Sequence, residues 1–143
     1  MTNVHTSQTA DETFAIGEEL GASLAGGDVV LLFGGLGAGK TLFTKGILNA
    51  LEFDIDEVTS PSFTLVNLYK TERFDVYHID LWRLDGKIDA AGAVGLDEIL
   101  EKDDAVTIIE WADRLGGFSF SNTAIRVRIE GDGHEPRVIT IER

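Results

Sequence analysis

Apolar positions in the first third of the chain predict a strand, a loop and a helix in direct succession. Residues 29–33 form an unbroken apolar run, which is typical of a strand that is buried on both faces. The stretch from 34 to 41 reads GGLGAGKT, so a glycine-rich loop follows the strand. Apolar side chains then recur at helical spacing over residues 41–51, and these are Leu42, Phe43, Ile47, Ala50 and Leu51.

A capping pattern predicts an earlier helix. Glu12 follows Thr9 by three residues, as in a capping box. An apolar stripe continues from there, formed by Ile16, Leu20 and Leu24. We expect this helix to end at the glycine pair of residues 26–27. Thr9 could serve only as the cap, or the start of this helix could lie beside the base of a nucleotide.

The later apolar runs predict strands around this centre. Residues 65–70 and 74–81 read as two strands joined by a polar turn, which makes an antiparallel hairpin. Residues 105–111 form a further apolar strand. The alternating runs 123–130 and 137–141 predict a second hairpin at the edge of the sheet.

Small side chains dominate residues 86–95, and we expect this stretch to be flexible. The apolar residues that follow fall on one short helical face, formed by Leu96, Ile99 and Leu100. Together the elements predict an α/β fold, a P-loop NTPase-like three-layer sandwich with a mostly parallel central sheet and added antiparallel hairpins. At 143 residues, we expect a single domain over residues 1–143.

The glycine-rich loop fits the pattern G-x-x-x-x-G-K-[ST] of a phosphate-binding loop. Glycines allow positive φ angles and let backbone N–H groups approach an anion. Lys40 would place a positive charge against the β- and γ-phosphates, and the Thr41 hydroxyl is suited to bind Mg²⁺. The helix that follows would point free N–H groups and its dipole at the same phosphates. The loop therefore predicts nucleotide binding.

An acidic residue stands at the end of the strand over residues 105–111. Glu110 follows an apolar run, as in the Walker B strand of a phosphate-loop site. Because ligands bind at the carboxyl ends of parallel strands, we expect Glu110 to hold the Mg²⁺ shell or to orient the attacking water. Its neighbour Trp111 could stack on the base or pack in the core.

Other polar residues of the middle region allow two interpretations each. Asp80 could bind Mg²⁺ directly or through water, or it could cap the turn at residues 85–86. His78 belongs to a residue type that is more often a core or hydrogen-bonding group than a catalytic one. The hydroxyl side chains of residues 59–64 could form a turn or could sense a γ-phosphate.

The charge balance limits the kinds of partner that this protein can bind. Lys and Arg number 12 and Asp and Glu 25, which gives a formal net charge of −13. Such a protein is repelled by a phosphate backbone unless its cations gather on one face. Arg126 and Arg128 share a strand face by period-two spacing, and we expect both in solvent. We therefore expect no autonomous nucleic-acid binding, and an acidic surface suits a basic protein partner.

Targeting signals are lacking in the sequence. No apolar run approaches the ~20 residues that a membrane span needs. The N-terminal stretch lacks the basic and apolar regions of a secretory signal. Cysteine is absent, which fits the cytoplasm. We expect a cytoplasmic protein that is not associated with a membrane.

Several blocks of this sequence resemble the TsaE family, formerly YjeE, of small bacterial P-loop ATPases for tRNA threonylcarbamoyladenosine synthesis. The blocks occur in order and at family-like spacing, at residues 32–41, 59–66, 76–84, 95–98 and 109–111. The patterns S-P-[ST]-[FY]-T-L and H-x-D-L-[YW]-R-L are far more specific than the phosphate loop itself.

The resemblance implies an ATPase that binds ATP and ADP with Mg²⁺ and works with the proteins TsaD and TsaB. In the family, ATP hydrolysis supports repeated rounds of threonylcarbamoyl transfer to the adenosine beside the anticodon, and TsaD performs the transfer. This chain would reach tRNA only through that complex. We expect slow hydrolysis by the chain alone, because a lone site without an arginine finger lacks compensation for transition-state charge.

Carried over by position, the resemblance assigns catalytic roles to Lys40, Asp80 and Glu110, and metal ligation to Thr41 and Glu110. The nucleotide-binding residues that it implies are Thr9, Gly35, Leu36, Gly37, Ala38, Gly39, Lys40, Thr41, Leu42 and Trp111. Trp111 would lie by the adenine, and residues 59–64 would respond to the nucleotide. In one departure, Gly35 stands where the family usually has an acidic residue, which could alter the hydrolysis rate while the phosphate cradle is kept.

Two other classes of protein share such a loop. A small P-loop kinase needs an acceptor pocket and usually an arginine-bearing lid. No lid-like block occurs after Glu110, where the arginines before the last residue are Arg114, Arg126, Arg128 and Arg137. A GTPase-like or stand-alone nucleotide-dependent switch would read guanine through an [NT]-K-x-D motif, which this sequence lacks, so adenine is favoured.

Overall fold

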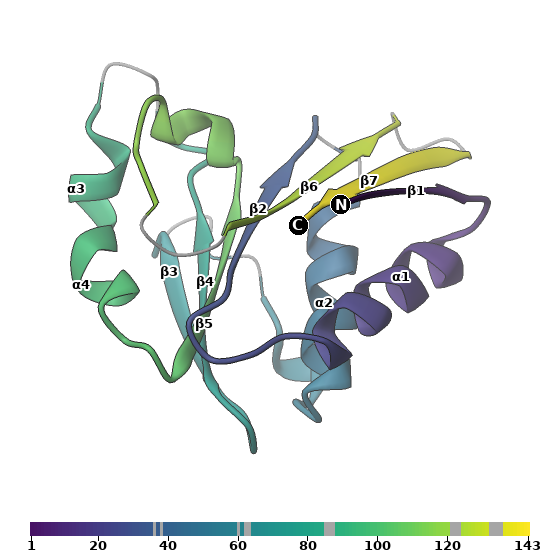
Figure 1. Cartoon of the computed structure of the whole chain (residues 1–143), viewed down its shortest axis with the longest axis horizontal. Helices are drawn as coiled ribbons and strands as arrows, with labels where there is room; N and C mark the ends of the chain where they lie inside the picture. The colour runs from purple at the N-terminus through teal and green to yellow at the C-terminus, as the bar shows by residue number, and fades with distance from the viewer. Residues whose placement is uncertain are drawn as a thin grey trace.

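A single mixed sheet forms the middle layer of the molecule. The computed structural model describes residues 1–35, 37, 39–59, 61, 64–84, 88–120, 124–131 and 136–143. Within these residues, seven strands lie in the order β1-β7-β6-β2-β5-β4-β3 (Figure 1). The bounds are β1 Thr2–Ser7, β2 Val29–Phe33, β3 Val66–Lys70, β4 Asp75–Asp80, β5 Ala105–Glu110, β6 Ala124–Glu130 and β7 Arg137–Glu142.

The four central strands are parallel, and the outer strands are antiparallel additions. β2 pairs in parallel with both β5 and β6, and β4 pairs in parallel with β5. The predicted hairpins form β3–β4 on one side and β6–β7 on the other. β1 extends the second side by pairing antiparallel with β7.

Helices cover both faces of the sheet. Figure 1 shows α1 (Ala10–Ala22) and α2 (Lys40–Ala50) together on one side, and α3 (Ala90–Val94) and α4 (Leu96–Leu100) on the other. Short 3-10 helices, η1 (Ile55–Glu57) and η2 (Ala112–Leu115), follow α2 and β5. The three layers confirm the predicted α/β fold class. Among the described residues, no helix combines the length and apolar character that crossing a bilayer requires.

Two apolar clusters fill the spaces between the layers. β2 contributes to both, because its successive side chains point to opposite faces. Val30 and Leu32 pack in the cluster that includes Phe43 and Ile47 of α2. Val29 and Leu31 pack in the cluster that includes Leu96 of α4. The prediction of a strand buried on both faces is confirmed.

Local structure differs from the expectations at three places. β1 was not predicted, because its mostly exposed sequence TNVHTS carries no apolar alternation. α1 ends at Ala22 instead of the glycine pair, because the backbone N–H and the hydroxyl of Ser23 both donate to the last turn of the helix. The stretch expected to be flexible contains α3, whose N-cap Asp89 accepts a hydrogen bond from the backbone of Gly92. Residues 85–87 lie outside the described part.

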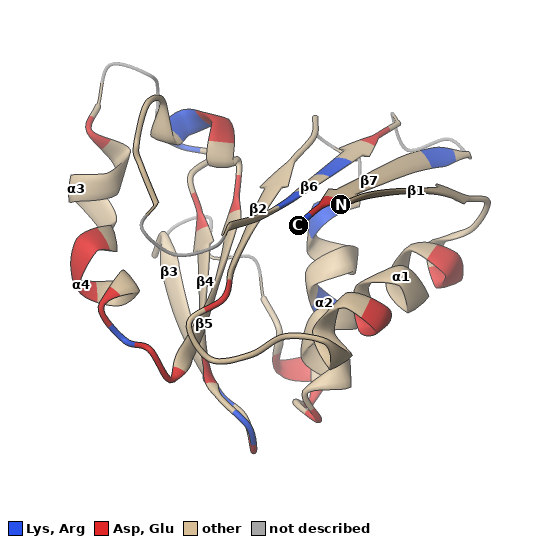
Figure 2. Ribbon diagram, in the orientation of Figure 1, with Lys and Arg blue, Asp and Glu red and all other residues tan. Residues whose placement is uncertain are grey.

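Charged side chains are dispersed over the described surface. Figure 2 shows Lys and Arg on separate segments, including β6, β7 and α2, and acidic residues on α1 and α4. Arg126 and Arg128 are both exposed, as predicted from their spacing. The guanidinium of Arg128 lies 5.2 Å from the ring of Phe33.

Glycines allow α1 and α2 to approach each other closely. A Cβ on Gly21 would lie 2.6 Å from the carbonyl oxygen of Ile47. A Cβ on Gly46 would overlap the carbonyl oxygen of Phe14, and one on Gly17 would overlap that of Phe43. These neighbours are backbone atoms, so they cannot swing aside as the end of a flexible side chain could. The contact between the two helices therefore requires small residues.

The Gly46→Ala substitution tests this contact. Helix propensity alone predicts a gain of roughly 1 kcal/mol in the free energy of unfolding. We expect instead a loss of about 1–3 kcal/mol, since the added methyl group forces the helix backbones apart. Urea unfolding measures the difference. Gly117→Ala is the control, because a Cβ there meets no atom within 4 Å. A Gly46→Ala protein as stable as the wild type would contradict the packing.

Candidate functional site

Parallel pairing brings the glycine-rich loop and Glu110 to one edge of the sheet. Leu32 on β2 is in register with Glu110 on β5, and Glu110 is in register with Asp80 on β4. The chain leaves β2 after Phe33 and enters the loop, so the loop begins beside the residue that ends β5. This edge, at the carboxyl ends of the parallel strands, is where α/β folds bind ligands.

Glycine backbone shapes the entry of the loop into α2. Gly37 and Gly39 have φ angles of 74° and 104°, in the region that favours glycine. Gly39 is the N-cap of α2 and provides no side-chain cap. The first N–H groups of the helix are thus left for another acceptor, as in anion sites. Leu36 and Ala38 lie outside the described residues, and Leu42 is half-buried on the first turn of α2.

The amine of Lys40 is bound to its own loop. Its Nζ donates hydrogen bonds to the carbonyl oxygens of Gly34 and Gly35, each at 2.7 Å. The same nitrogen lies 4.2 Å from the centroid of the Trp111 ring, in cation–π geometry. Burial lowers the pKa of Lys40 below 10.5, and the negative charges of nearby acids, Glu110 first, oppose that shift.

Glu110 joins the helix to the neighbouring strand. Its Oε1 accepts a hydrogen bond from Thr41 Oγ1 at 3.3 Å, and its Oε2 accepts one from His78 Nε2 at 2.5 Å. Glu110 and His78 are both buried. The carboxylate is therefore held from two sides, with one oxygen facing the hydroxyl that follows Lys40.

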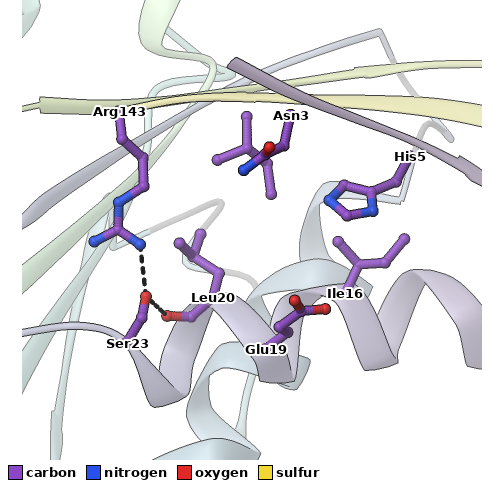
Figure 3. Close-up of a pocket in the computed structure, with 8 residues that line it drawn as sticks. Asn3, His5, Ile16, Glu19, Leu20, Ser23 and Arg143 are labelled. Atoms are coloured by element: carbon purple, nitrogen blue, oxygen red, sulfur yellow. Dashed lines mark hydrogen bonds between the residues drawn. The ribbon is translucent and has the colours of Figure 1, made fainter. Parts of the chain in front are cut away.

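Two surface hollows bear on the position of the site. One lies beside the loop and is lined by residues that include Gly34, Gly35 and Trp111. The other lies between α1 and the edge formed by β1 and β7, where the guanidinium of Arg143 donates to the hydroxyl of Ser23 (Figure 3). None of the residues lining this second pocket was predicted as a site residue. The first hollow, by contrast, is lined by the predicted site residues Gly35 and Trp111.

Comparison with known proteins agrees with this geometry. The model of the family described as "Threonylcarbamoyl adenosine biosynthesis protein TsaE" matches residues 7–139. The chain belongs to the TsaE family. Its fold also matches the crystal structure of Bacillus subtilus YdiB, with a TM-score of 0.78 and 30% identity, over 99% of this chain and 84% of that one.

Curated TsaE proteins are similar along most of their length. The tRNA threonylcarbamoyladenosine biosynthesis protein TsaE of Mycobacterium tuberculosis is 34% identical over 137 residues, which cover 91% of this chain and 80% of that protein. The protein of the same name from Treponema pallidum is 36% identical over 136 residues, 94% of this chain and 96% of that protein. The resemblance to the TsaE family, whose members serve this tRNA modification, is confirmed.

Asp80 lies at the same sheet edge and caps the turn that follows β4. Its side chain is buried, and Oδ1 accepts a hydrogen bond from the backbone N–H of Trp82 at 2.9 Å. Its charge also acts on the Lys40 amine. Asp80 thus caps the backbone at Trp82. The predicted capping at residues 85–86 lies outside the described part and stays a prediction. The metal or catalytic role implied for Asp80 stays a prediction.

Trp111 combines an unusual backbone with a central position. Its φ of 58° puts a non-glycine residue in the left-handed region directly after β5. The ring packs on that of Trp82, with centroids 4.7 Å apart, and next to the Lys40 amine. In this TsaE-family chain the tryptophan therefore borders Lys40, the lysine that we predict to bind phosphate. Its stacking on an adenine stays a prediction.

The N-terminal helix starts close to the loop. The Thr9 hydroxyl accepts a hydrogen bond from the Glu12 backbone N–H, which is one half of the predicted capping box. The Glu12 carboxylate accepts its hydrogen bond from the backbone N–H of Gln8 instead of that of Thr9, so the other half is displaced by one residue. One turn later, Thr13 Cγ2 lies 3.7 Å from where a Cβ on Gly39 would be. Contact between Thr9 and a nucleotide base stays a prediction.

The segment expected to respond to nucleotide is described only in part, because Ser60, Ser62 and Phe63 lie outside the described residues. The Thr59 carbonyl accepts a hydrogen bond from the Tyr69 hydroxyl at 2.9 Å, and Thr64 Oγ1 donates to the side chain of Asn67. Both flanks of the segment are thus attached to β3. Its sensing of a phosphate stays a prediction.

Sequence reasoning missed two partners of the site. His78 was interpreted as a core or hydrogen-bonding residue, and its partner is Glu110 itself. Period-two spacing puts His78 on the same face of β4 as Asp80, which is the signal that pointed to this edge. Arg137 reaches the loop from β7, and no motif marked it. A Cβ on Gly35 would meet no described atom within 4 Å, so the backbone there leaves room for the first atom of a side chain.

The Lys40→Met substitution tests the electrostatic state of the lysine. Because burial lowers the pKa of Lys40 in the folded chain, the unfolded chain holds more protons between the two pKa values. The free energy of unfolding then rises with pH in that interval. We expect the wild type to gain stability relative to Lys40→Met as the pH is raised from neutral toward 10.5. Urea unfolding of both proteins at several pH values measures this gap, and a constant gap would contradict the assignment.

Proposed function

We propose that this chain is a single ATPase domain that binds ATP with Mg²⁺ at the glycine-rich loop and hydrolyses it in tRNA threonylcarbamoyladenosine biosynthesis. We further propose that it acts with the proteins TsaD and TsaB, and that it does not perform the threonylcarbamoyl transfer itself. The observation that carries this proposal is the meeting of Lys40, Thr41 and Glu110 at the carboxyl edge of β2 and β5.

Phosphate binding is supported by the loop and by the state of its lysine. The loop supplies glycine backbone and a helix start without a side-chain cap. Lys40 is hydrogen bonded to two carbonyl oxygens, which are weaker partners for an ammonium group than phosphate oxygens. A bound phosphate chain would therefore draw the amine away from Gly34 and Gly35. Its charge would also favour the protonated form of the amine, against the effect of burial.

The oxygen donors of Thr41 and Glu110 fit magnesium. Hard oxygen ligands suit this ion, which takes one or two protein ligands together with phosphate oxygens and water. The Thr41 hydroxyl and a Glu110 carboxylate oxygen are 3.3 Å apart. Across the described part of the chain, no cluster of three or more His, Asp or Glu could hold a metal. The pair would thus bind the ion only together with a nucleotide. When bound, magnesium neutralises part of the charge on the phosphates.

Residues around Glu110 would organise hydrolysis. His78 fixes one carboxylate oxygen of Glu110, so the other is left for Thr41, the metal shell or the attacking water. Asp80, in register with Glu110, adds a second negative charge at the same edge. We expect slow turnover by the chain alone and faster turnover with partners, since a partner would have to supply charge compensation in the transition state.

Two alanine variants separate binding from turnover. We expect Lys40→Ala to abolish ADP and ATP binding, because the loop loses its only side-chain cation for the phosphates. We expect Glu110→Ala to retain nucleotide binding and to lose ATP hydrolysis. Calorimetric titration and phosphate release measure the two properties. Lys45→Ala on the same helix and Glu101→Ala on the surface are the matched controls. Normal hydrolysis by Glu110→Ala would contradict the assignment of this carboxylate.

The partner assignment is tested with purified TsaD and TsaB. We expect a pull-down on this chain to retain both proteins in the presence of ATP, and we expect ATP hydrolysis to rise on their addition. An assay of modified tRNA should then require the chain with its loop intact, so the Lys40→Ala protein should fail to support repeated modification. Phosphorylation of a small molecule without any partner would contradict the proposal and would favour a kinase.

A further inference from the structure

A buried arginine approaches the glycine-rich loop from the other end of the chain. Arg137 opens β7, and its side chain is 8% exposed. Its guanidinium Nη2 donates a hydrogen bond to the carbonyl oxygen of Gly37 at 3.2 Å. Its Nε lies 3.7 Å from where a Cβ on Gly39 would be. The arginine thus binds Gly37 and lies beside Gly39, two of the loop glycines that have positive φ angles.

β1, β7 and α1 meet beside Arg137 and Gly39. Arg137 is in register with Ser7 of β1, which is buried. The Ser7 hydroxyl is hydrogen bonded to the Thr13 hydroxyl at 2.7 Å and to the Thr9 carbonyl at 2.8 Å. The methyl group of Thr13 flanks the same point on Gly39 as the arginine does. β1, α1 and β7 therefore form one support for the loop.

The stem of the arginine also requires a glycine. A Cβ on Gly131 would lie 2.9 Å from Arg137 Cγ, too close for any side chain there. The end of β6 thus leaves room for the stem on its way to the loop. A guanidinium remains charged at every physiological pH, and a buried charge is costly unless polar groups compensate it. The carbonyl of Gly37 is such a group, so the charge and the loop are energetically linked.

The contact has a consequence for the loop backbone. A guanidinium that holds the Gly37 carbonyl fixes the direction of that carbonyl at a glycine with a positive φ angle. Backbone N–H groups are what a phosphate loop offers to its anion. A loop already held in one orientation binds its ligand without an additional ordering cost.

We propose that Arg137 is a positioning residue that holds the turn at Gly37 and Gly39 in its phosphate-binding conformation. The inference rests on the proposed nucleotide site and names the element that organises it. The C-terminal hairpin, which lies far from the loop in the sequence, thereby determines the affinity for the phosphate chain. Arg137 acts through the loop backbone and has no catalytic role of its own.

The test compares Arg137→Met and Arg137→Lys with wild type, using ADP and inorganic pyrophosphate as probes in calorimetric titrations. Loss of a hydrogen bond to a charged group corresponds to a loss of about 10-fold or more in affinity. We expect Arg137→Met to lose at least that factor for both probes alike, because the loop contacts only phosphates. Arg137→Lys keeps the charge but not the planar donors, so an intermediate loss is expected. In steady-state hydrolysis, the KM for ATP should rise by the same factor as the dissociation constant while kcat changes less than 3-fold.

Controls separate this inference from the proposed function and from misfolding. Arg126→Met removes an exposed arginine from β6 and should leave both affinities unchanged. Failure of the wild type to bind ADP would sink the proposed function. Wild-type affinity in a folded Arg137→Met protein would overturn the inference alone. If thermal unfolding shows that Arg137→Met does not fold, the Arg137→Lys protein decides, and wild-type affinity for pyrophosphate in that variant would overturn the proposal.

Discussion

The parallel pairing of β2 with β5 is the constraint on which the site depends. The register of Leu32 with Glu110 means that the loop after β2 opens beside the carboxylate that ends β5. This carboxylate comes from a distant part of the chain, since Glu110 follows Thr41 by 69 residues. Both strands are buried on two faces, so a slip in register would disrupt two apolar clusters at once. The packing of the core thereby maintains the geometry of the site.

Interactions within the site engage the same groups that we propose for nucleotide binding. Lys40 binds two carbonyls and a tryptophan face, Thr41 donates to Glu110, and Glu110 also accepts from His78. Each of these groups is buried or half-buried, so leaving it without a partner would cost about 1–3 kcal/mol or more. The internal hydrogen bonds offset that cost. The same bonds must be exchanged when a ligand enters.

The elements that could be predicted from the sequence are those in which burial leaves a periodic pattern. The apolar run of β2, the helical spacing of α2 and the apolar run of β5 predicted these three elements, because each is surrounded by core. The roles of the loop and of Glu110 stay predictions. β1 was not predicted, because an edge strand is held by backbone hydrogen bonds and has few buried side chains. The short helix α3 depends on its aspartate cap and on the packing of Ala90 in an apolar cluster. It was not predicted, because its small residues alone do not indicate a helix.

Long-range contacts of polar residues could not be predicted. Whether His78 meets Glu110 depends on the register of β4 with β5, and whether Arg137 meets Gly37 depends on where β7 joins the sheet. Neither contact can be predicted from the composition of the neighbouring sequence. The period-two spacing on β4 does place His78 and Asp80 on one face of the strand. The sequence therefore indicates the face on which His78 lies, but not the residue that His78 contacts. The family resemblance favoured one of the two interpretations that the residues allowed for Asp80 and for Trp111, and the described contacts make both roles testable.

The most direct test of the account is a crystal structure of the chain with magnesium and a non-hydrolysable ATP analogue. The account predicts that the Lys40 amine leaves the carbonyls of Gly34 and Gly35 for the phosphates, and that one metal ion lies between the Thr41 hydroxyl and Glu110. A structure in which the analogue binds elsewhere while Lys40 keeps both carbonyl hydrogen bonds would contradict it.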